Sequence, residues 1–316
     1  QDLEGINYTN IPQEIEQQNI DKLYGNNLKT SISKLETYRR CPFSYYLQYG
    51  LKLKEKEELK IQTFNTGSLM HETIDQFFEY VRSEGLELAD ITEEQILEIV
   101  SNIIDENLNL SKNFIFTATA KYKVLVKRLK KIVSKALKYI IQTIIYSDFS
   151  IEGTEVEFAE KGKYKPIILE LEDGKKIEIT GKIDRIDTSK KENGKYLRII
   201  DYKSSAKNID LNEVYAGLQI QLLTYTDAIC KQEDIIPAGI FYFSLLEQMV
   251  KADKRIDEDE IEEIIRKNFK MKGLIVADVK IIKMNDNSLQ SGSSKIVPAA
   301  ITASGGVNEK WTNGVK

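Results

Sequence analysis

The spacing of apolar and polar residues divides this chain into a helical first part and an α/β second part. Apolar residues recur at helical intervals over about 66–82 and again over about 118–147, which predicts two long amphipathic helices. A further helix is expected to begin at Thr92, because Gln95 follows three residues later with the spacing of a capping box. Residues up to about 147 are therefore predicted to be mainly helical.

The segment before these helices is more polar. Residues 1–27 are rich in Gln, Asn and Glu and only weakly periodic, so we expect a linker or a loosely packed lead-in there. Ser33 and Glu36 have capping-box spacing, which predicts that a short helix starts at Ser33, and Pro42 interrupts it. This segment is expected to form a helical N-terminal arm.

The pattern changes to short β-rich runs after residue 150. Four of these runs are expected to be strands, at 151–160, 165–171, 175–187 and 195–203. Asp173-Gly174 and Asn193-Gly194 lie between runs and predict hairpin turns. The remaining pattern predicts a helix over about 211–230, a strand over 238–246, a charged helix over about 257–269 and a last strand over 274–282. This order indicates an α/β domain.

The folded domain is assigned to residues 28–285. From about residue 284 the sequence turns to Ser, Asn, Gly and Ala, as in NDNSLQSGSS. Such a composition offers little apolar surface to bury, so residues 286–316 are expected to form a flexible or truncated tail. Since the first residue is Gln1 and not Met, we interpret the chain as a piece of a longer protein.

Composition narrows the class of protein. The chain has 316 residues, of which 41% are apolar and 30% charged, and it has neither a transmembrane run nor a secretion signal, as expected of a soluble globular protein. The two cysteines, Cys41 and Cys230, are far apart in sequence and fit a reducing, cytoplasmic compartment. The net charge of −4 does not indicate nucleic acid binding by the chain as a whole, so any such site must be local.

A carboxylate and a lysine leave the end of one apolar strand together. Asp201 and Lys203 are two residues apart, so they point to the same face of a strand. Asp184 can come close to Asp201 if 176–187 and 195–203 form a hairpin. Two adjacent carboxylates favour a bound cation, and Mg²⁺ or Mn²⁺ beside a lysine suggests phosphodiester hydrolysis. The alternative is an ordinary ion pair at a strand end.

Two further features fit this chemistry. His71, the only histidine, shares an apolar helix face with Phe78, so it points inward, either as a metal ligand or as an ordinary core histidine. Gln221 and Tyr225 are four residues apart on one helix face, where they could bind a phosphate or a base, or simply pack against the sheet.

Four motifs in order, GSLMHE, GKIDRID, DYKSS and QLLTY, resemble those of the RecB-like nucleases of the PD-(D/E)XK superfamily. The lead-in KLETYRRCPFSYYLQYGLKL is similar to the start of the C-terminal nuclease domain of AddB subunits. The resemblance covers about residues 28–285. It implies an α/β, restriction-endonuclease-like core with a mixed central sheet flanked by helices.

The resemblance also implies an activity and its residues. A Mg²⁺- or Mn²⁺-dependent exonuclease would cut single-stranded DNA that the partner AddA unwinds during double-strand break processing and recombinational repair. Lys203 would be the catalytic lysine, and Gln221 and Tyr225 would lie near the DNA backbone. The implied metal ligands are His71, Asp184, Asp201 and the carbonyl of Tyr202. The alternatives are a free-standing RecB-like exonuclease of the Cas4 kind, or a non-catalytic scaffold that binds AddA or DNA.

Cys41 matches the first cysteine of the iron–sulfur site of this family. The family has three more cysteines after the nuclease core, whereas this chain has none there, and Cys230 lies within a predicted helix. One cysteine cannot hold a 4Fe-4S cluster, so we expect no cluster in this chain.

DNA binding requires a local positive surface. Residues 121–140 carry eight Lys or Arg side chains and no acidic residue. The positions that we expect to contact DNA are Lys127, Arg128, Lys130 and Lys131. An ordinary solvated helix face explains the pattern equally well.

Overall fold

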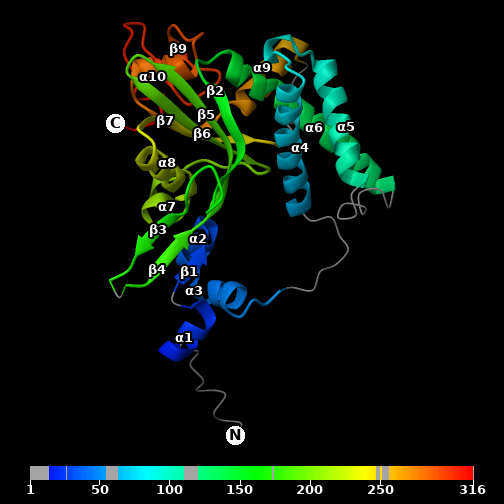
Figure 1. The fold of residues 1–316 in the computed structure, drawn as a ribbon. Helices are drawn as coiled ribbons and strands as arrows, with labels where there is room; N and C mark the ends of the chain where they lie inside the picture. The colour runs from blue at the N-terminus through cyan, green and yellow to red at the C-terminus, as the bar shows by residue number, and fades with distance from the viewer. Residues whose placement is uncertain are drawn as a thin grey trace, which may run out of the picture.

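The computed structural model describes residues 14–25, 27–54, 63–109, 120–172, 174–246, 250 and 256–315. Figure 1 shows a central sheet with helices packed on both of its faces and a smaller N-terminal arm beside it. This is the α/β arrangement with a helical arm that the sequence predicts.

The central sheet has six strands in the order β11-β8-β7-β6-β5-β2. Their bounds are β2 Ser150–Phe158, β5 Gly181–Lys191, β6 Gly194–Lys203, β7 Ile235–Ser244, β8 Lys272–Val276 and β11 Gly314–Val315. The pairs β6–β7 and β8–β11 are parallel and the others antiparallel, so the predicted mixed sheet is confirmed. The predicted turn at Asn193-Gly194 joins β5 to β6, where Gly194 pairs with Lys191.

Helices cover each face of this sheet because its inner strands are apolar on both faces. Ile200 and Ile199 of β6, for example, belong to the two different cores. The larger core packs the sheet against α4 (Thr63–Ser83), α5 (Glu93–Asn109), α6 (Ala120–Ile145), α9 (Glu258–Phe269) and α10 (Val279–Asn285). The smaller core packs it against α2 (Ile32–Arg40) and α8 (Gln221–Gln232). Within the described ranges, every helix is too short or too polar to cross a lipid bilayer.

The N-terminal arm contains more regular structure than the polar lead-in suggested. It begins with α1 (Gln17–Tyr24) and β1 (Asn27–Thr30), followed by α2, α3 (Pro42–Tyr45) and a π-helical turn at Tyr46–Gly50. β1 pairs in parallel with β4 (Lys176–Ile179), and β4 pairs antiparallel with β3 (Ile167–Glu170). The expected strand over 175–187 is therefore two strands, interrupted at Thr180, and the first belongs to this small sheet. The other predicted turn lies between β3 and β4, although its Asp173 is outside the described residues.

Only one of the two predicted capping boxes is present. At the start of α5, the Thr92 N–H donates to Gln95 Oε1 at 2.9 Å and the Gln95 N–H donates to Thr92 Oγ1 at 3.3 Å. The box at Ser33 is wrong, because α2 begins at Ile32. Glu36 instead accepts a hydrogen bond from the Ile220 N–H at 2.8 Å. This long-range contact ties α2 to the start of α8.

Two other predicted elements are interrupted. The helix over 211–230 is divided into α7 (Leu211–Tyr215) and α8, because Gly217 and Gln219 between them have φ angles of +80° and +53°, outside the helical range. The strand over 274–282 ends with β8 at Val276. Asp278 then accepts hydrogen bonds from two main-chain N–H groups and begins the helix α10.

The expected flexible tail is wrong for the part of residues 286–316 that the structure describes. Ile296, Val297 and Ala299 are buried in the larger core, and β11 adds an edge strand to the central sheet. The Ser294 hydroxyl donates to Asp286 Oδ2 at 2.6 Å. This hydrogen bond fixes the connection between β9 (Gly292–Ser293) and its antiparallel partner β10 (Ala300–Ile301). The few apolar side chains of this polar segment are thus the ones that pack into the core.

A buried ion cluster joins the sheet to its helices. Arg185, Asp187 and Arg198 are each at most 1% exposed. The Nε atoms of Arg185 and Arg198 lie 2.9 and 2.8 Å from opposite oxygens of Asp187. Arg198 also donates to the Thr143 carbonyl oxygen of α6 at 3.1 Å and to Asn285 Oδ1 of α10 at 3.3 Å. Asp187 is therefore the shared counter-charge of two guanidinium groups that have almost no access to water.

Replacing this carboxylate should strongly destabilise the fold. We expect Asp187→Ala to lower the free energy of unfolding by about 3–5 kcal/mol, because it leaves two buried cations without a counter-charge. Asp227→Ala, which removes an exposed carboxylate paired with Lys231, should change it by about 0.5 kcal/mol or less. Urea unfolding of both variants measures the difference. Equal effects would show that the cluster contributes little.

Candidate active site

The site forms where the β5–β6 pairing ends, opposite an interruption in the β2–β5 pairing. The β5–β6 pairing ends at Arg185–Ile200, and Asp184 Oδ2 accepts a hydrogen bond from the Tyr202 N–H at 2.7 Å. On the other side, Glu155 of β2 has a φ of +49°, a rare conformation for a residue other than glycine. The two carboxylates therefore come from places where the regular strand pairing is interrupted.

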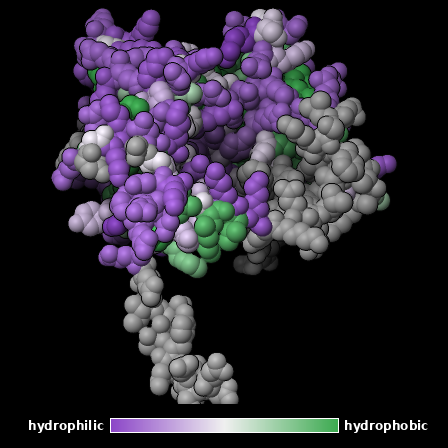
Figure 2. All heavy atoms as spheres, turned by 60° about the horizontal axis from the view of Figure 1, so that its bottom comes forward, coloured by the Kyte–Doolittle hydropathy of each residue, from purple (hydrophilic) through white to green (hydrophobic). Residues whose placement is uncertain are grey.

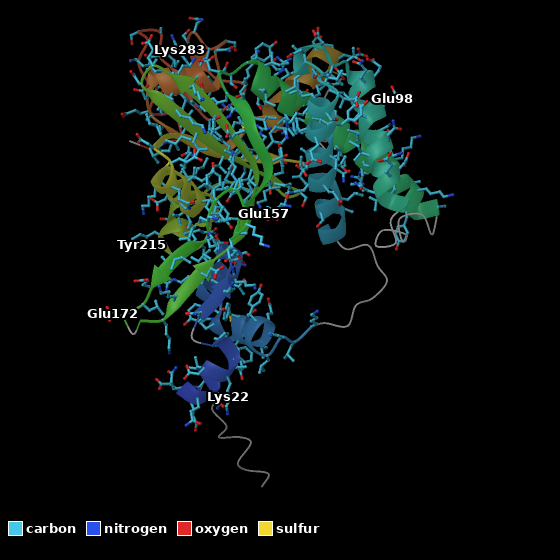
Figure 3. The ribbon with its side chains drawn as sticks, in the orientation of Figure 1. Lys22, Glu98, Glu157, Glu172, Tyr215 and Lys283 are labelled. Carbon is cyan, nitrogen blue, oxygen red and sulfur yellow. The ribbon has the colours of Figure 1, made fainter. Side chains whose placement is uncertain are left out.

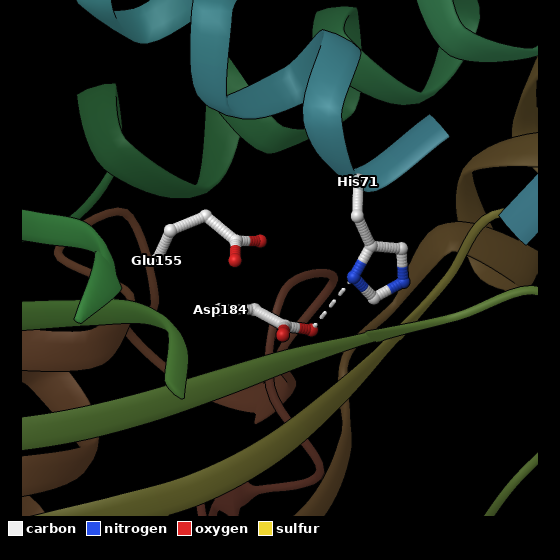
Figure 4. Close-up of side chains that lie close together, drawn as sticks. All are labelled: His71, Glu155 and Asp184. Atoms are coloured by element: carbon white, nitrogen blue, oxygen red, sulfur yellow. Dashed lines mark ion pairs between the residues drawn. The ribbon is translucent and has the colours of Figure 1, made fainter. Parts of the chain in front are cut away.

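Helix α4 adds a histidine to these carboxylates (Figure 4). His71 Nδ1 lies 3.3 Å from Asp184 Oδ2, and the His71 ring meets the Tyr202 ring edge to face at 5.9 Å. His71, Glu155 and Asp184 each offer one ligand atom, and these three atoms lie within 4.8 Å of one another. The apolar stripe on α4 turns His71 toward the sheet, as its spacing predicts.

The three side chains open into a cleft of about 780 Å³ between α4 and the ends of the strands. Its wall also contains Asp75 and Glu79 of α4, and Lys182 and Lys203 of the sheet. Gly67 of α4 lies next to Ser204 in the loop after β6, and both residues line the cleft. Figure 2 shows the molecule turned with the bottom of Figure 1 forward, and its surface there is mostly hydrophilic and hollowed near the centre.

Asp201 and Lys203 form a close pair at the end of β6. Lys203 Nζ lies 2.5 Å from Asp201 Oδ2, and this buried oxygen has no other polar partner among the described residues. Burial, together with the negative charge of Asp184, raises the pKa of Asp201 to about 6, against the opposing effect of Lys203. Although burial disfavours its charged form, the pKa of His71 is raised, because Asp184 and the other carboxylates stabilise the imidazolium.

This concentration of negative charge fits a divalent cation. His71, Glu155 and Asp184 supply one imidazole nitrogen and two carboxylate oxygens. Asp201 is outside this group of three and is paired with Lys203, but its charge acts on both His71 and Asp184. The carboxylate oxygens suit Mg²⁺ and Mn²⁺, and Mn²⁺ also accepts an imidazole nitrogen as a ligand. These are the side chains that could hold such a metal.

Sequence reasoning missed Glu155. In a regular strand Glu155 and Glu157 would face the same side, so nothing in the alternation distinguishes them. The left-handed backbone at Glu155 turns its side chain into the cleft, where it lies 2.6 Å from Lys182 Nζ. Glu157 stays exposed on the surface of β2 (Figure 3). Three acidic residues in one short strand were the only available signal.

The Gln221–Tyr225 pair is divided between two environments. Tyr225 is buried and stacks on Phe158 with ring centres 4.9 Å apart, and burial raises its pKa to about 12. Its hydroxyl lies so close to Gly181 that a Cβ atom there would overlap it. Tyr225 therefore supports the start of β5 from within the core. Gln221 is half-buried at the start of α8, and its side chain has no hydrogen bond to the described residues.

The basic helix and the cysteines lie outside this cleft. Lys130 on α6 binds both carboxylate oxygens of Asp105 on α5, at 2.6 and 2.7 Å. Lys127, Arg128 and Lys131 are exposed on α6, and none of them lines the cleft. Cys41 is exposed in the N-terminal arm, where its Sγ accepts a hydrogen bond from the Ser44 N–H, and Cys230 is half-buried on α8.

Metal binding to the cleft should depend on pH. We expect the affinity for Mn²⁺ to rise between pH 5 and pH 7, because Asp201, with its pKa near 6, and His71 must lose protons before the metal binds. One unit below that pKa, competition by the Asp201 proton alone weakens binding about tenfold. Calorimetric titration at several pH values measures this. Asp201→Asn should flatten the profile, and a profile equally steep in that variant would contradict the assignment.

Comparison with known proteins identifies the family. The model of the PD-(D/E)XK nuclease superfamily matches residues 29–288. AddB-type subunits of the ATP-dependent helicase/deoxyribonuclease are 39% identical to this chain in Clostridium novyi over 310 residues, in Acetivibrio thermocellus over 308 and in Clostridioides difficile over 315. These alignments cover 96–97% of the chain but only 27% of each relative. The chain belongs to the PD-(D/E)XK nuclease superfamily and is homologous to the C-terminal part of AddB-type subunits.

Proposed function

We propose that this chain is a metal-dependent deoxyribonuclease domain that hydrolyses phosphodiester bonds of single-stranded DNA. The observation that supports it most directly is the meeting of His71, Glu155 and Asp184 in one cleft, beside the Asp201–Lys203 pair. These groups come from α4, β2, β5 and β6, so the fold gathers them from four separate segments. Membership of the nuclease superfamily supports phosphodiester hydrolysis as the reaction of this site.

Each group has a distinct part in this proposal. His71, Glu155, Asp184 and Asp201 would hold Mg²⁺ or Mn²⁺, with the Tyr202 carbonyl oxygen as a further ligand. The metal would lower the pKa of a bound water and offset the charge that develops on the phosphate. Lys203 would donate hydrogen bonds to a phosphate oxygen or orient the attacking water, and Asp201 holds its ammonium in place.

The relatives support a biological setting for this activity. Their name describes one subunit of an ATP-dependent helicase/deoxyribonuclease. We therefore propose that the domain works in the cytoplasm with an AddA-type helicase subunit, and cuts one strand of the unwound duplex from its end during double-strand break repair. In this setting the helicase supplies the single strand, and the nuclease domain supplies the hydrolysis.

A nuclease assay on end-labelled single-stranded DNA tests the reaction. We expect cutting with Mg²⁺ or Mn²⁺ and none with EDTA. Lys203→Ala should lower the rate about 10²-fold or more, because it removes a cation aimed at the reacting phosphate. Asp201→Ala should abolish metal-dependent cutting. If the wild-type chain binds Mn²⁺ and DNA but does not cut, a non-catalytic scaffold replaces the proposed nuclease.

Two glutamates of β2 provide a matched comparison. Glu155→Gln should lower both Mn²⁺ affinity and the cutting rate at least tenfold, because it removes one ligand charge from the cleft. Glu157→Gln, two residues away on the same strand but exposed, should leave both unchanged. Equal behaviour of the two variants would remove Glu155 from the metal site.

A further inference from the structure

Lys207 is a half-buried lysine with no counter-charge in contact. Its ammonium makes no hydrogen bond and no ion pair with the residues that the structure describes. Instead, Nζ lies 5.0 Å from the centre of the Tyr242 ring. Lys203 Nζ lies 5.8 Å from the same ring centre. Two ammonium groups therefore share one aromatic ring at the end of the central sheet.

The other lysines at this end of the sheet already have partners. Lys203 is paired with Asp201, and Lys182 is paired with Glu155 at 2.6 Å. Both of these lysines line the cleft, whereas Lys207 lies outside the lining, four residues after Lys203. Among these three lysines, Lys207 is therefore the one whose charge has no ion-pair partner and is available to a ligand.

Nearby acidic groups act on Lys207 only from a distance. Its closest electrostatic neighbours include Asp201, Glu36 and Glu213, and none of them lies within ion-pair distance of its ammonium. Glu36 already accepts a hydrogen bond from Ile220 N–H, and Glu213 accepts one from the Gln219 side chain. Burial, and then the positive charge of Lys203, lowers the pKa of Lys207. An anion placed against this ammonium would relieve both effects.

We propose that Lys207 binds the phosphate next to the one that is cut, on the DNA strand as it leaves the cleft across the ends of β6 and β7. The inference rests on the proposed nuclease function. A cation that holds a neighbouring phosphate binds the ground state and the transition state equally well. Lys207 is therefore a positioning residue that lowers KM, while Lys203 acts on the reacting phosphate.

The salt dependence of DNA binding tests this contact without any cutting. In EDTA, the binding of a fluorescent dT oligonucleotide is measured by anisotropy between 50 and 300 mM NaCl. Each phosphate contact to a single strand contributes about 0.7 to the slope of log K against log salt. Lys207→Ala should lower the magnitude of the slope by about 0.7, and Lys207→Arg should preserve it. Lys190→Ala, an exposed lysine at the opposite end of β5, is the control and should leave it unchanged.

Cutting kinetics separate this inference from the proposed function. In the presence of Mg²⁺, Lys207→Ala should raise KM severalfold with kcat within about twofold of wild type. A wild-type slope and KM in Lys207→Ala would overturn the phosphate contact while leaving the nuclease intact, and so would a loss confined to kcat. If the wild-type chain does not cut, the nuclease proposal fails, and the salt slope alone decides whether Lys207 binds phosphate.

Discussion

Asp187 places a single carboxylate between two arginine side chains in the interior of the protein, and much of the architecture depends on that contact. Arg198 reaches α6 and α10, while Arg185 donates to the Tyr202 hydroxyl at 3.0 Å. Charges taken out of water in this way are tolerated only when each has a well-placed partner. The cluster therefore fixes the positions of β5 and β6 relative to the helices. Because Tyr202 also contacts His71, it helps to set the distance from α4 to the sheet.

The cleft exists because the regular strand pairing in the centre of the sheet is interrupted near one end. Beyond Arg185, β5 separates from β6 while it stays paired with β2, and the carboxylate of Asp184 accepts a hydrogen bond from the Tyr202 N–H. Glu155 leaves the regular conformation at the neighbouring position of β2. The separation brings acidic side chains close together, and their mutual repulsion in a partly buried site is what makes a cation favourable there.

Much of this arrangement could be read from residue type and spacing. The helical period placed His71 on the inward face of α4, and Asn193-Gly194 correctly located the hairpin that brings Asp184 near Tyr202. Local patterns were misleading where a distant contact outweighed them. Glu36 has the spacing of a capping residue, but its carboxylate binds the start of α8. Lys130 belongs to a basic stretch, but Asp105 of the neighbouring helix neutralises it.

The sequence by itself determined the strands and helices with clear periodicity and the α/β class, because these depend on residues a few positions apart along the chain. It also singled out the histidine, the lysine and two of the carboxylates proposed for the site. Only the tertiary structure decided that Glu155 faces the cleft and Glu157 does not, that Tyr225 is buried, and that residues near Val297 complete the core. The physical reason is common to all three. Irregular backbone angles and the burial of small side chains depend on groups that are remote in sequence, and no local pattern encodes them.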